Sequence, residues 1–445
     1  MNKPNPPKND PKTIFGWCMY DWANSAYATT VAVGLLPVYF ASVVVGPDGI
    51  SIGGTVYKAT TLWGIAIGVA AIITFLLAPL LGAVADFANA KKRFLLLLAY
   101  TGSLFTILLF FSKSGDVWST LTFFVIAQIC FIGANVFYDA FLPVIATDEK
   151  MDMVSGKGFS YGYVGGGLQL ALSFGLVAFH HIFGISQTQA VRIGILGAGL
   201  WWAGFTLFAA KALTEDNRPG SLPKGYEGFR FIPAAYAAVG LSRLIETTRR
   251  VRKFRHLVLF LLSFMLYNDG IQTVLNMATI YGKEELKLST THLLITVLII
   301  QAVASVGAIA FSKLAELAGT KKTIMATLLL WSFIVVYAYF INTTAQFFAA
   351  GVMAGLVMGG SQALSRSFYG SMIPERASAE FYGFYTVFSK FSAIWGPFVF
   401  AGINQMTGSA RNSILSVIIF FILGLVLLQF VDERKARQAR NSDVF

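Results

Sequence analysis

The chain has 445 residues, of which 56% are hydrophobic and 13% are charged, and its mean hydropathy is +0.66. Soluble globular domains carry about 25% charged residues, so this composition excludes a soluble enzyme, a disordered chain and a secreted disulfide-rich scaffold. The formal net charge of +12 does not indicate nucleic acid, because most basic residues lie in the connections between apolar runs.

Apolar runs long enough to cross a bilayer occur at twelve places along the chain. The first six lie near 14–42, 60–85, 94–112, 119–142, 159–182 and 191–210, and the second six near 257–280, 290–313, 323–341, 345–369, 381–406 and 411–431. The long connection between them predicts an N-terminal six-helix bundle over 1–210, a linker over 211–256, and a C-terminal bundle with a basic tail over 257–445. We therefore expect an all-α membrane protein with twelve transmembrane helices in two six-helix bundles.

The positions of lysine and arginine predict the orientation of these helices. If the N-terminus is cytoplasmic, most of the 34 basic residues fall in cytoplasmic segments, as the positive-inside rule requires. The basic residues of the opposite side are Lys58, Lys113, Arg192, Lys283, Lys287 and Arg411. Both termini are then cytoplasmic. In the linker, apolar and basic residues intersperse over 232–255, which predicts an amphipathic helix on the inner membrane face, with a flexible linker as the alternative.

Two of the short loops repeat the same pattern. Gly82-Ala-Val-Ala-Asp86-Phe-Ala-Asn89-Ala-Lys91-Lys92-Arg93 follows the second helix, and Ser312-Lys-Leu-Ala-Glu316-Leu-Ala-Gly319-Thr-Lys321-Lys322 follows the eighth. An acid and basic residues at a helix end can pair across neighbouring helix ends, so the loops predict a latch that opens and closes. Its candidate residues are Gly82, Asp86, Lys91, Lys92, Glu316, Lys321 and Lys322. The alternative is that the lysines only obey the positive-inside rule.

The repeat continues inside the helices. Asp21-x-x-Asn24-Ser25 in the first helix matches Asp269-x-x-Gln272-Thr273 in the seventh, and Asn135 and Asp139 align with Gln362 and Arg366. This order suggests a parallel duplication with a substrate path where the two halves meet. Glycines also recur at every fourth position at 158, 162 and 166 and at 351, 355 and 359, which predicts close helix contacts.

The first loop resembles the signature of the major facilitator superfamily, Gly-x-x-x-Asp-x-x-Gly-Arg-Lys. Here Asn89 and Ala90 replace the second Gly and the Arg, and Glu316 replaces the Asp in the second copy. The segments Tyr20–Tyr27, Tyr267–Thr273 and Gly360–Ser367 resemble the vacuole-effluxer family, which includes the autophagy-related vacuolar amino-acid effluxer and bacterial permeases. This resemblance covers helices 1 to 10. It implies solute transport, with amino acids favoured, and a cavity lined by helices 1, 4, 7 and 10.

Polar side chains within the apolar helices are the candidate substrate site. An ionised group at mid-bilayer costs at least ~2.5–3.5 kcal/mol unless it faces water or a partner. The candidate substrate-binding residues are Asp269, Gln272, Asn276, Gln362, Arg366, Asn24, Asn135 and Lys390. A zwitterion would place its ammonium on an Asp and its carboxylate on Arg366 or Lys390. The alternative is a fixed ion pair between Asp139 and Arg366.

Proton coupling is a further hypothesis, with Asp269 as the first candidate and Asp139 and Asp21 behind it. Asp21 lies nearer the cytoplasmic end of the first helix, so a helix-terminal or gating role fits it nearly as well as substrate contact. We expect no catalytic residue, cofactor or metal site, since the sequence contains no Ser-His-Asp grouping, HExxH or paired Cys motif.

These patterns predict a secondary active or facilitative transporter of a small polar solute that works by alternating access. We expect a monomer in a bacterial inner membrane, with a small-molecule substrate, membrane lipids and protons as partners and no nucleic acid. One alternative is an exporter of lipids or of amphiphilic, drug-like molecules. An alternative from another class is a membrane receptor or scaffold that does not transport.

Overall fold

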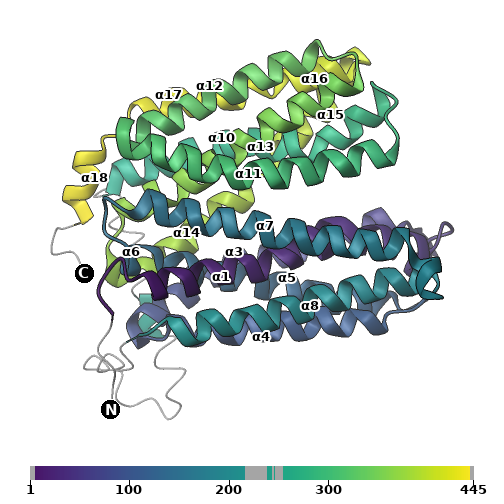
Figure 1. Ribbon diagram of the computed structural model, residues 1–445, viewed down its shortest axis with the longest axis horizontal. Coiled ribbons are helices and arrows are strands. Elements are labelled where there is room, and N and C mark those ends of the chain that lie inside the picture. Colours follow the sequence, from purple (N-terminus) through teal and green to yellow (C-terminus); the bar gives the residue numbers. More distant parts are fainter. Residues whose placement is uncertain (1–5, 216–237, 243–244, 246–253, 441–445) are drawn as a thin grey trace. The chain divides into compact units, whose positions relative to one another are not determined.

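The computed structural model describes residues 6–215, 238–242, 245 and 254–440. This part of the chain is almost entirely helical (Figure 1), which confirms the predicted all-α class. Its β structure is one short antiparallel hairpin, in which β1 (Ile50–Ile52) pairs with β2 (Thr55–Tyr57). Most of the amphipathic helix predicted over 232–255 falls outside the described residues.

The helices follow the predicted apolar runs. Those of the N-terminal half are α1 (Pro11–Ala26), η1 (Tyr27–Leu35), α2 (Leu36–Tyr39), η2 (Phe40–Val45), α3 (Ala59–Ala88), α4 (Lys91–Leu108), η3 (Leu109–Phe111), α5 (Val117–Ala140), α6 (Leu142–Ile145), α7 (Met151–Ala178), η4 (His180–Phe183) and α8 (Gln187–Ala212). Those of the C-terminal half are α10 (Arg255–Glu284), α11 (Thr290–Ala318), α12 (Thr320–Tyr339), α13 (Thr344–Met372), η6 (Glu375–Ala377), α14 (Ser378–Phe391), α15 (Trp395–Thr407), α16 (Ala410–Ser416), α17 (Ile418–Gln429) and α18 (Glu433–Arg440).

Eleven helical segments of the described chain are long and apolar enough to cross a membrane. They coincide with all the predicted spans except that at 159–182, where the structure has α7. This helix has 28 residues and is long enough to cross, but Asp152, Lys157 and its many glycines make it less apolar. The count of twelve spans and the cytoplasmic location of the termini therefore stay predictions.

Two predicted helices are interrupted. The run at 381–406 is divided into α14 and α15 by a break at Ser392–Ile394, and the run at 411–431 is divided at Val417. Some other helices begin with a side-chain cap: Thr343 and Gln346, for example, form a reciprocal capping box at the start of α13. The break at Ser392–Ile394 is different because it leaves backbone N–H groups inside a predicted span, and these need acceptors from elsewhere.

The described chain forms two compact units. Unit 1 contains 6–78, 88–138 and 161–215, and unit 2 contains 79–87, 139–160, 238–242, 245 and 254–440. In unit 1, α8 packs against α1 and α4; in unit 2, α11 packs against α13 and α10 against α17 (Figure 1). Unit 2 therefore combines most of the C-terminal half with two segments of the N-terminal half. The domain boundaries near 210 and 257 stay a prediction.

Glycine allows close helix contacts at two of the positions with the predicted fourfold spacing. A Cβ at Gly359 of α13 would lie 2.0 Å from the carbonyl oxygen of Ala304 in α11. In unit 1, a Cβ at Gly166 of α7 would lie 3.0 Å from the carbonyl oxygen of Ser25. At Gly359 the approach leaves no room for a larger side chain, and at Gly166 it leaves little.

Candidate functional site

The polar residues of α1 face those of α5 within unit 1. Asn24 donates through Nδ2 to Oδ1 of Asn135 at 2.6 Å, and the hydroxyl of Tyr138 donates to Oδ2 of Asp21 at 3.0 Å. Asn24 is only 2% exposed. The two asparagines predicted to contact substrate therefore bind each other in this structure, and a substrate would have to compete with that hydrogen bond.

Asp269 lies in α10 of unit 2 and is 2% exposed. Its Oδ1 accepts a hydrogen bond from the backbone N–H of Gly396 at 2.9 Å, in the first turn of α15. The preceding residue, Asn268, donates to the hydroxyl of Ser392 at 2.5 Å. Helix α10 thus supplies partners to the broken helix on both sides of the break, and the carboxylate is stabilised by the positive end of the helix dipole.

The acid and hydroxyl pattern that α1 and α10 share packs on the same type of residue in each unit. A Cβ at Gly396 would lie 1.8 Å from Oγ1 of Thr273 and 2.8 Å from Oδ1 of Asp269. In unit 1, a Cβ at Gly162 of α7 would lie 2.8 Å from the hydroxyl of Ser25 and 3.1 Å from Oδ1 of Asp21. The acid and hydroxyl of each copy therefore pack on a glycine. The copies differ because α7 is continuous there, whereas α15 begins beside Asp269 and donates a backbone N–H to it.

The remaining candidates of unit 2 differ in exposure. Gln272 and Gln362 are half-buried, and Asn276 and Lys390 are exposed. Lys390 lies in the last turn of α14, just before the break at Ser392–Ile394. Asp269 binds the first turn of α15, just after the break, and Lys390 precedes the break in the chain. This part of unit 2 therefore carries both a negatively and a positively charged side chain.

Arg366 of α13 is buried among partners of unit 2, with 3% exposure. Its Nη1 lies 3.1 Å from Oδ1 of Asp139, so the ion pair considered as the alternative is present. Its Nε donates to the hydroxyl of Ser155 at 3.0 Å and its Nη2 to the carbonyl of Ser155 at 2.9 Å. The guanidinium also lies 4.1 Å from the ring centre of Phe159. A substrate carboxylate could bind Arg366 only after some of these contacts open.

The first copy of the loop motif binds the start of α14. Asp86 accepts hydrogen bonds from the backbone N–H groups of Ala379 at 3.2 Å and Glu380 at 2.8 Å. One turn earlier on the same face of α3, a Cβ at Gly82 would lie 2.3 Å from the carbonyl oxygen of Ala379. The Gly-x-x-x-Asp spacing therefore combines a close approach with a helix cap.

The second copy lies against the start of α7. Glu316 forms an ion pair of 3.3 Å with Lys150, and the hydroxyl of Thr320 donates to Oδ2 of Asp152 at 2.7 Å. A Cβ at Gly156 of α7 would lie 2.2 Å from the hydroxyl of Ser312, the residue that corresponds to Gly82. The two loops thus bind the starts of two equivalent helices.

The backbone conformation at Asn89 explains why asparagine can replace the second glycine of the loop motif. Its φ is +47°, and Gly319, at the same place in the second copy, has a φ of +91°. Asparagine is one of the few residues other than glycine that adopt this left-handed region readily. The replacement of Gly by Asn89 therefore preserves the turn.

The lysines of the two loops hold helix ends. The backbone N–H groups of Lys91 and Lys92 each donate to the carboxylate of Glu215 at 2.9 Å, within unit 1. In unit 2, Nζ of Lys321 donates to the carbonyls of Gln429 and Val431 at 2.8 Å each. Lys321 therefore satisfies backbone carbonyls at the C-terminal end of α17, and Lys322 is exposed.

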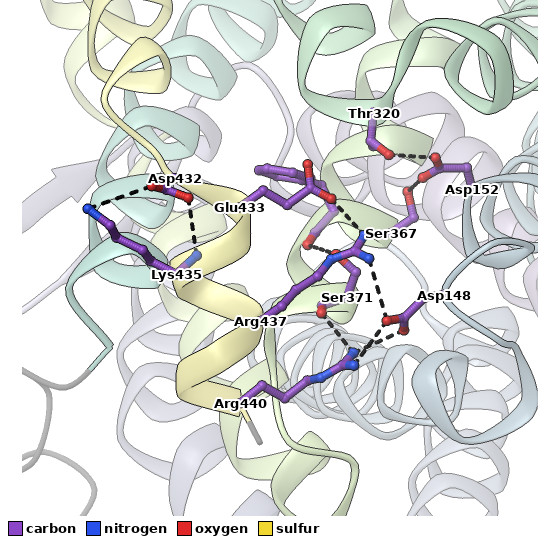
Figure 2. Close-up of polar contacts among 11 residues, drawn as sticks. Asp148, Asp152, Thr320, Ser367, Ser371, Asp432, Glu433, Lys435, Arg437 and Arg440 are labelled. Carbon is purple, nitrogen blue, oxygen red and sulfur yellow. Dashed lines mark hydrogen bonds and ion pairs between the residues drawn. The ribbon is translucent and has the colours of Figure 1, made fainter. Parts of the chain in front are cut away.

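Helix α18 contributes contacts that the sequence analysis missed (Figure 2). Arg440 binds both carboxylate oxygens of Asp148, at 2.9 and 3.0 Å, and donates to the carbonyl of Ser371 at 2.9 Å. Arg437 lies 3.7 Å from the same carboxylate. The i, i+3 spacing of the two arginines places them on one helix face. This spacing is the sequence feature from which the contact could have been predicted.

A buried carboxylate completes this region of unit 2. Asp152 of α7 accepts hydrogen bonds from the hydroxyls of Ser367 at 2.5 Å and Thr320 at 2.7 Å (Figure 2). Within the described chain, no group of three or more His, Cys, Asp or Glu side chains is placed to hold a metal ion. The polar contacts instead join the starts and ends of helices.

A family model described as "Vacuole effluxer Atg22 like" matches residues 9–441. The "Uncharacterized MFS-type transporter YxiO" of Bacillus subtilis is 33% identical over 419 residues, which are 94% of each chain. "Autophagy-related protein 22-1" of Aspergillus niger is 29% identical over 303 residues, 64% of this chain and 48% of that protein. The chain thus spans about half the length of the fungal relative.

Two solved structures have a similar fold. The human organic anion transporter MFSD10 (TETRAN) has a TM-score of 0.67 and 16% identity, and the alignment covers 95% of this chain and 100% of that one. The major facilitator superfamily proton:xylose symporter XylE also has a TM-score of 0.67, with 14% identity and 96% coverage of both chains. At these identities the similarity concerns the fold and not the substrate.

Proposed function

Because the chain belongs to the vacuole effluxer (Atg22-like) family of major facilitator superfamily transporters, we propose that it carries a small polar solute, with amino acids favoured, across a bacterial inner membrane. It is an integral membrane transporter and not an enzyme. The proposal includes a monomer that works by alternating access. The observation that supports it most is the acid–glycine packing of Asp269 on Gly396 at the break before α15.

A zwitterion matches the groups at this break. The carboxylate of an amino acid would take the backbone N–H of Gly396 and the ammonium of Lys390, while Asp269, released from Gly396, would bind the amino acid's ammonium. After this exchange each charged group would have a partner, so an ionic substrate could bind in a predicted span without leaving an unpaired charge. Gln272 and Asn276 follow Asp269 on the same helix and would complete the polar surface.

The substitution Asp269→Asn tests this site. Asparagine keeps the size of the side chain and one acceptor oxygen for Gly396 but removes the charge that would bind an ammonium. Losing a charged hydrogen bond costs about 1.5–3 kcal/mol, so we expect the rate of labelled amino-acid counterflow in liposomes to fall about tenfold to a hundredfold. The amount of inserted protein should not change.

Asp48→Asn provides a matched control, because Asp48 is exposed and lies outside the candidate site. If Asp269→Asn has the wild-type counterflow rate, the proposal that Asp269 binds the substrate is wrong. If the wild type shows no counterflow with any amino acid, a stabilisation screen with peptides, sugars and lipids would identify the solute class or leave the alternative of a non-transporting receptor.

We also propose that transport is coupled to protons through Asp269. Asp139 is paired with Arg366 and Asp21 accepts a hydrogen bond from Tyr138, so these carboxylates are second candidates. A pH gradient imposed across liposomes should change the steady-state accumulation of the solute. If accumulation does not change with the pH gradient, proton coupling is contradicted and facilitated exchange is the remaining mechanism.

The contacts at the starts of α7 and α14 are the proposed gate. We infer that two groups of contacts hold this part of unit 2 closed in the present state and release in another state: Asp86 of α3 with the start of α14, and Arg366 of α13 with α7. The contacts of Asp86 and those of Arg366 each join an N-terminal segment to the C-terminal half, and each group of contacts lies within unit 2. The predicted latch residues Gly82, Asp86 and Glu316 all take part in contacts of this kind.

Gly82→Ala tests the gate by steric means. The new Cβ would lie 2.3 Å from the carbonyl oxygen of Ala379, and overpacking of this kind costs about 1–3 kcal/mol. We expect faster hydrogen–deuterium exchange at the backbone amides of Ala379 and Glu380 and a changed transport rate. Gly68→Ala on the same helix is the control, since no atom lies within 4 Å of its Cβ position. Equal exchange in the two variants would contradict the gate.

A further inference from the structure

A groove of about 490 Å³ lies in unit 2 where α10 begins and α17 ends. It is lined by Arg255, His256, Val258, Leu259, Leu262, Phe430 and Lys435. The apolar residues form one part of the lining, and the three basic side chains form the other. This combination matches an amphiphile that carries a negative headgroup.

The apolar part of the groove is open to the surroundings. Phe430 is 66% exposed and Leu262 is 39% exposed, while Val258 and Leu259 are half-buried. Both exposed side chains lie at the ends of predicted spans, where lipid acyl chains meet the headgroup region. The distribution of basic residues predicts that this end of the helices is cytoplasmic.

The polar part of the groove is held in place by the backbone. The N–H of Asp432 donates to Nδ1 of His256 at 3.1 Å, so Nε2 of the neutral ring carries the proton and is a donor. This bond ties the start of α10 to the segment that leads into α18. Lys435 lies on the side of α18 away from Arg437 and Arg440, which bind Asp148 (Figure 2).

The nearby carboxylates do not cancel the basic charge. Asp432 accepts a hydrogen bond from the backbone N–H of Lys435 at 3.1 Å, which lowers the pKa of its carboxyl group, and lies 3.7 Å from Nζ of the same lysine. Glu433 is paired with Arg437 at 2.6 Å. Arg255, which also lines the groove, is exposed. Asp432 therefore offsets the charge of Lys435 at most and leaves that of Arg255.

We propose that this groove binds one anionic phospholipid, with Arg255 and Lys435 on the phosphate and Leu262 and Phe430 against the acyl chain. The ε2 N–H of His256 is a third donor to the phosphate oxygens. A free phosphate would use the same donors but would leave the apolar lining uncovered. The inference does not depend on the transported substrate, because it concerns a surface of α10 and α18 and none of the proposed substrate contacts.

Binding of phosphatidylglycerol and phosphatidylcholine to the purified full chain tests the proposal, for example by native mass spectrometry. Each basic side chain near an anionic headgroup contributes about a fivefold preference. Two such side chains predict that phosphatidylglycerol binds about 25-fold more tightly than phosphatidylcholine. The double variant Arg255→Gln/Lys435→Gln should lose this preference and keep the wild-type denaturation temperature, since both side chains are exposed.

Arg434→Gln is the matched control, because Arg434 is an exposed residue of the same helix that does not line the groove. It should keep the full preference for phosphatidylglycerol. An equal loss in Arg434→Gln would indicate diffuse attraction and overturn the site, as would equal binding of the two lipids by the wild type. Displacement of phosphatidylglycerol by millimolar glycerol 3-phosphate would show a free-anion site instead of a lipid site.

Discussion

Arg366→Gln is expected to abolish transport and to lower the denaturation temperature of the protein markedly. The substitution removes the partner 3.1 Å from the Asp139 carboxylate and both guanidinium contacts to Ser155. Removing one member of a buried ion pair costs about 3–5 kcal/mol, because the remaining charge loses its compensation. Counterflow in liposomes and thermal denaturation in detergent would measure the two effects.

The double variant Asp139→Asn/Arg366→Gln separates the possible causes. It leaves no uncompensated charge, so its stability should recover by several degrees relative to Arg366→Gln. Recovery of transport as well would assign Arg366 to the gate, whereas recovered stability without transport would assign it to substrate binding. Arg376→Gln, at an exposed position between α13 and α14, should behave as wild type. A stable and active Arg366→Gln protein would contradict both roles.

Gly396→Ala is expected to reduce transport as severely as a change of Asp269 itself. The added Cβ would lie 1.8 Å from Oγ1 of Thr273 and 2.8 Å from Oδ1 of Asp269. Since Thr273 is fully buried, α10 and α15 must separate, and the hydrogen bond from Gly396 to Asp269 is lost. Overpacking costs about 1–3 kcal/mol of folding free energy. We expect the loss of counterflow rate to be larger than the loss of stability, measured as the fall in denaturation temperature, can account for.

Two further variants make this result specific. Gly402→Ala adds the same methyl group to the same helix, at a position where no atom lies within 4 Å, and should transport at the wild-type rate. Thr273→Ala combined with Gly396→Ala removes the atom nearest the clash and should restore part of the activity. If Gly396→Ala is as active as Gly402→Ala, the packing of Asp269 on Gly396 has no part in transport.

Much of the helical framework could be predicted because hydrophobic runs and their flanking charges are local features of the sequence. The acid and hydroxyl pattern shared by α1 and α10 is also present in the structure, since each copy packs on a glycine of another helix. Arg366 and Asp139 were recognised as possible partners for the same reason: ionised groups in apolar segments have few ways to be compensated.

The features that were missed depend on contacts distant in sequence. The break at Ser392–Ile394 contains neither proline nor glycine, and its partners Asn268 and Asp269 belong to another helix. The contact of α18 with Asp148 joins residues almost 300 positions apart. Helix α7 was expected to resemble the other spans, but its glycines and charged residues reduce its apolar character while they allow close packing.

The border between the two units crosses three continuous helices. It falls between Ala78 and Pro79 and again between Phe87 and Ala88 in α3, between Tyr138 and Asp139 in α5, and between Ser160 and Tyr161 in α7. Proline removes a backbone donor within α3, and α5 ends one residue after Asp139.

The crossing in α7 lies between Gly158 and Gly162, and glycine has a lower intrinsic helix propensity than alanine. A substitution in α3, α5 or α7 can therefore alter the packing of both units, because each of these helices contributes residues to both.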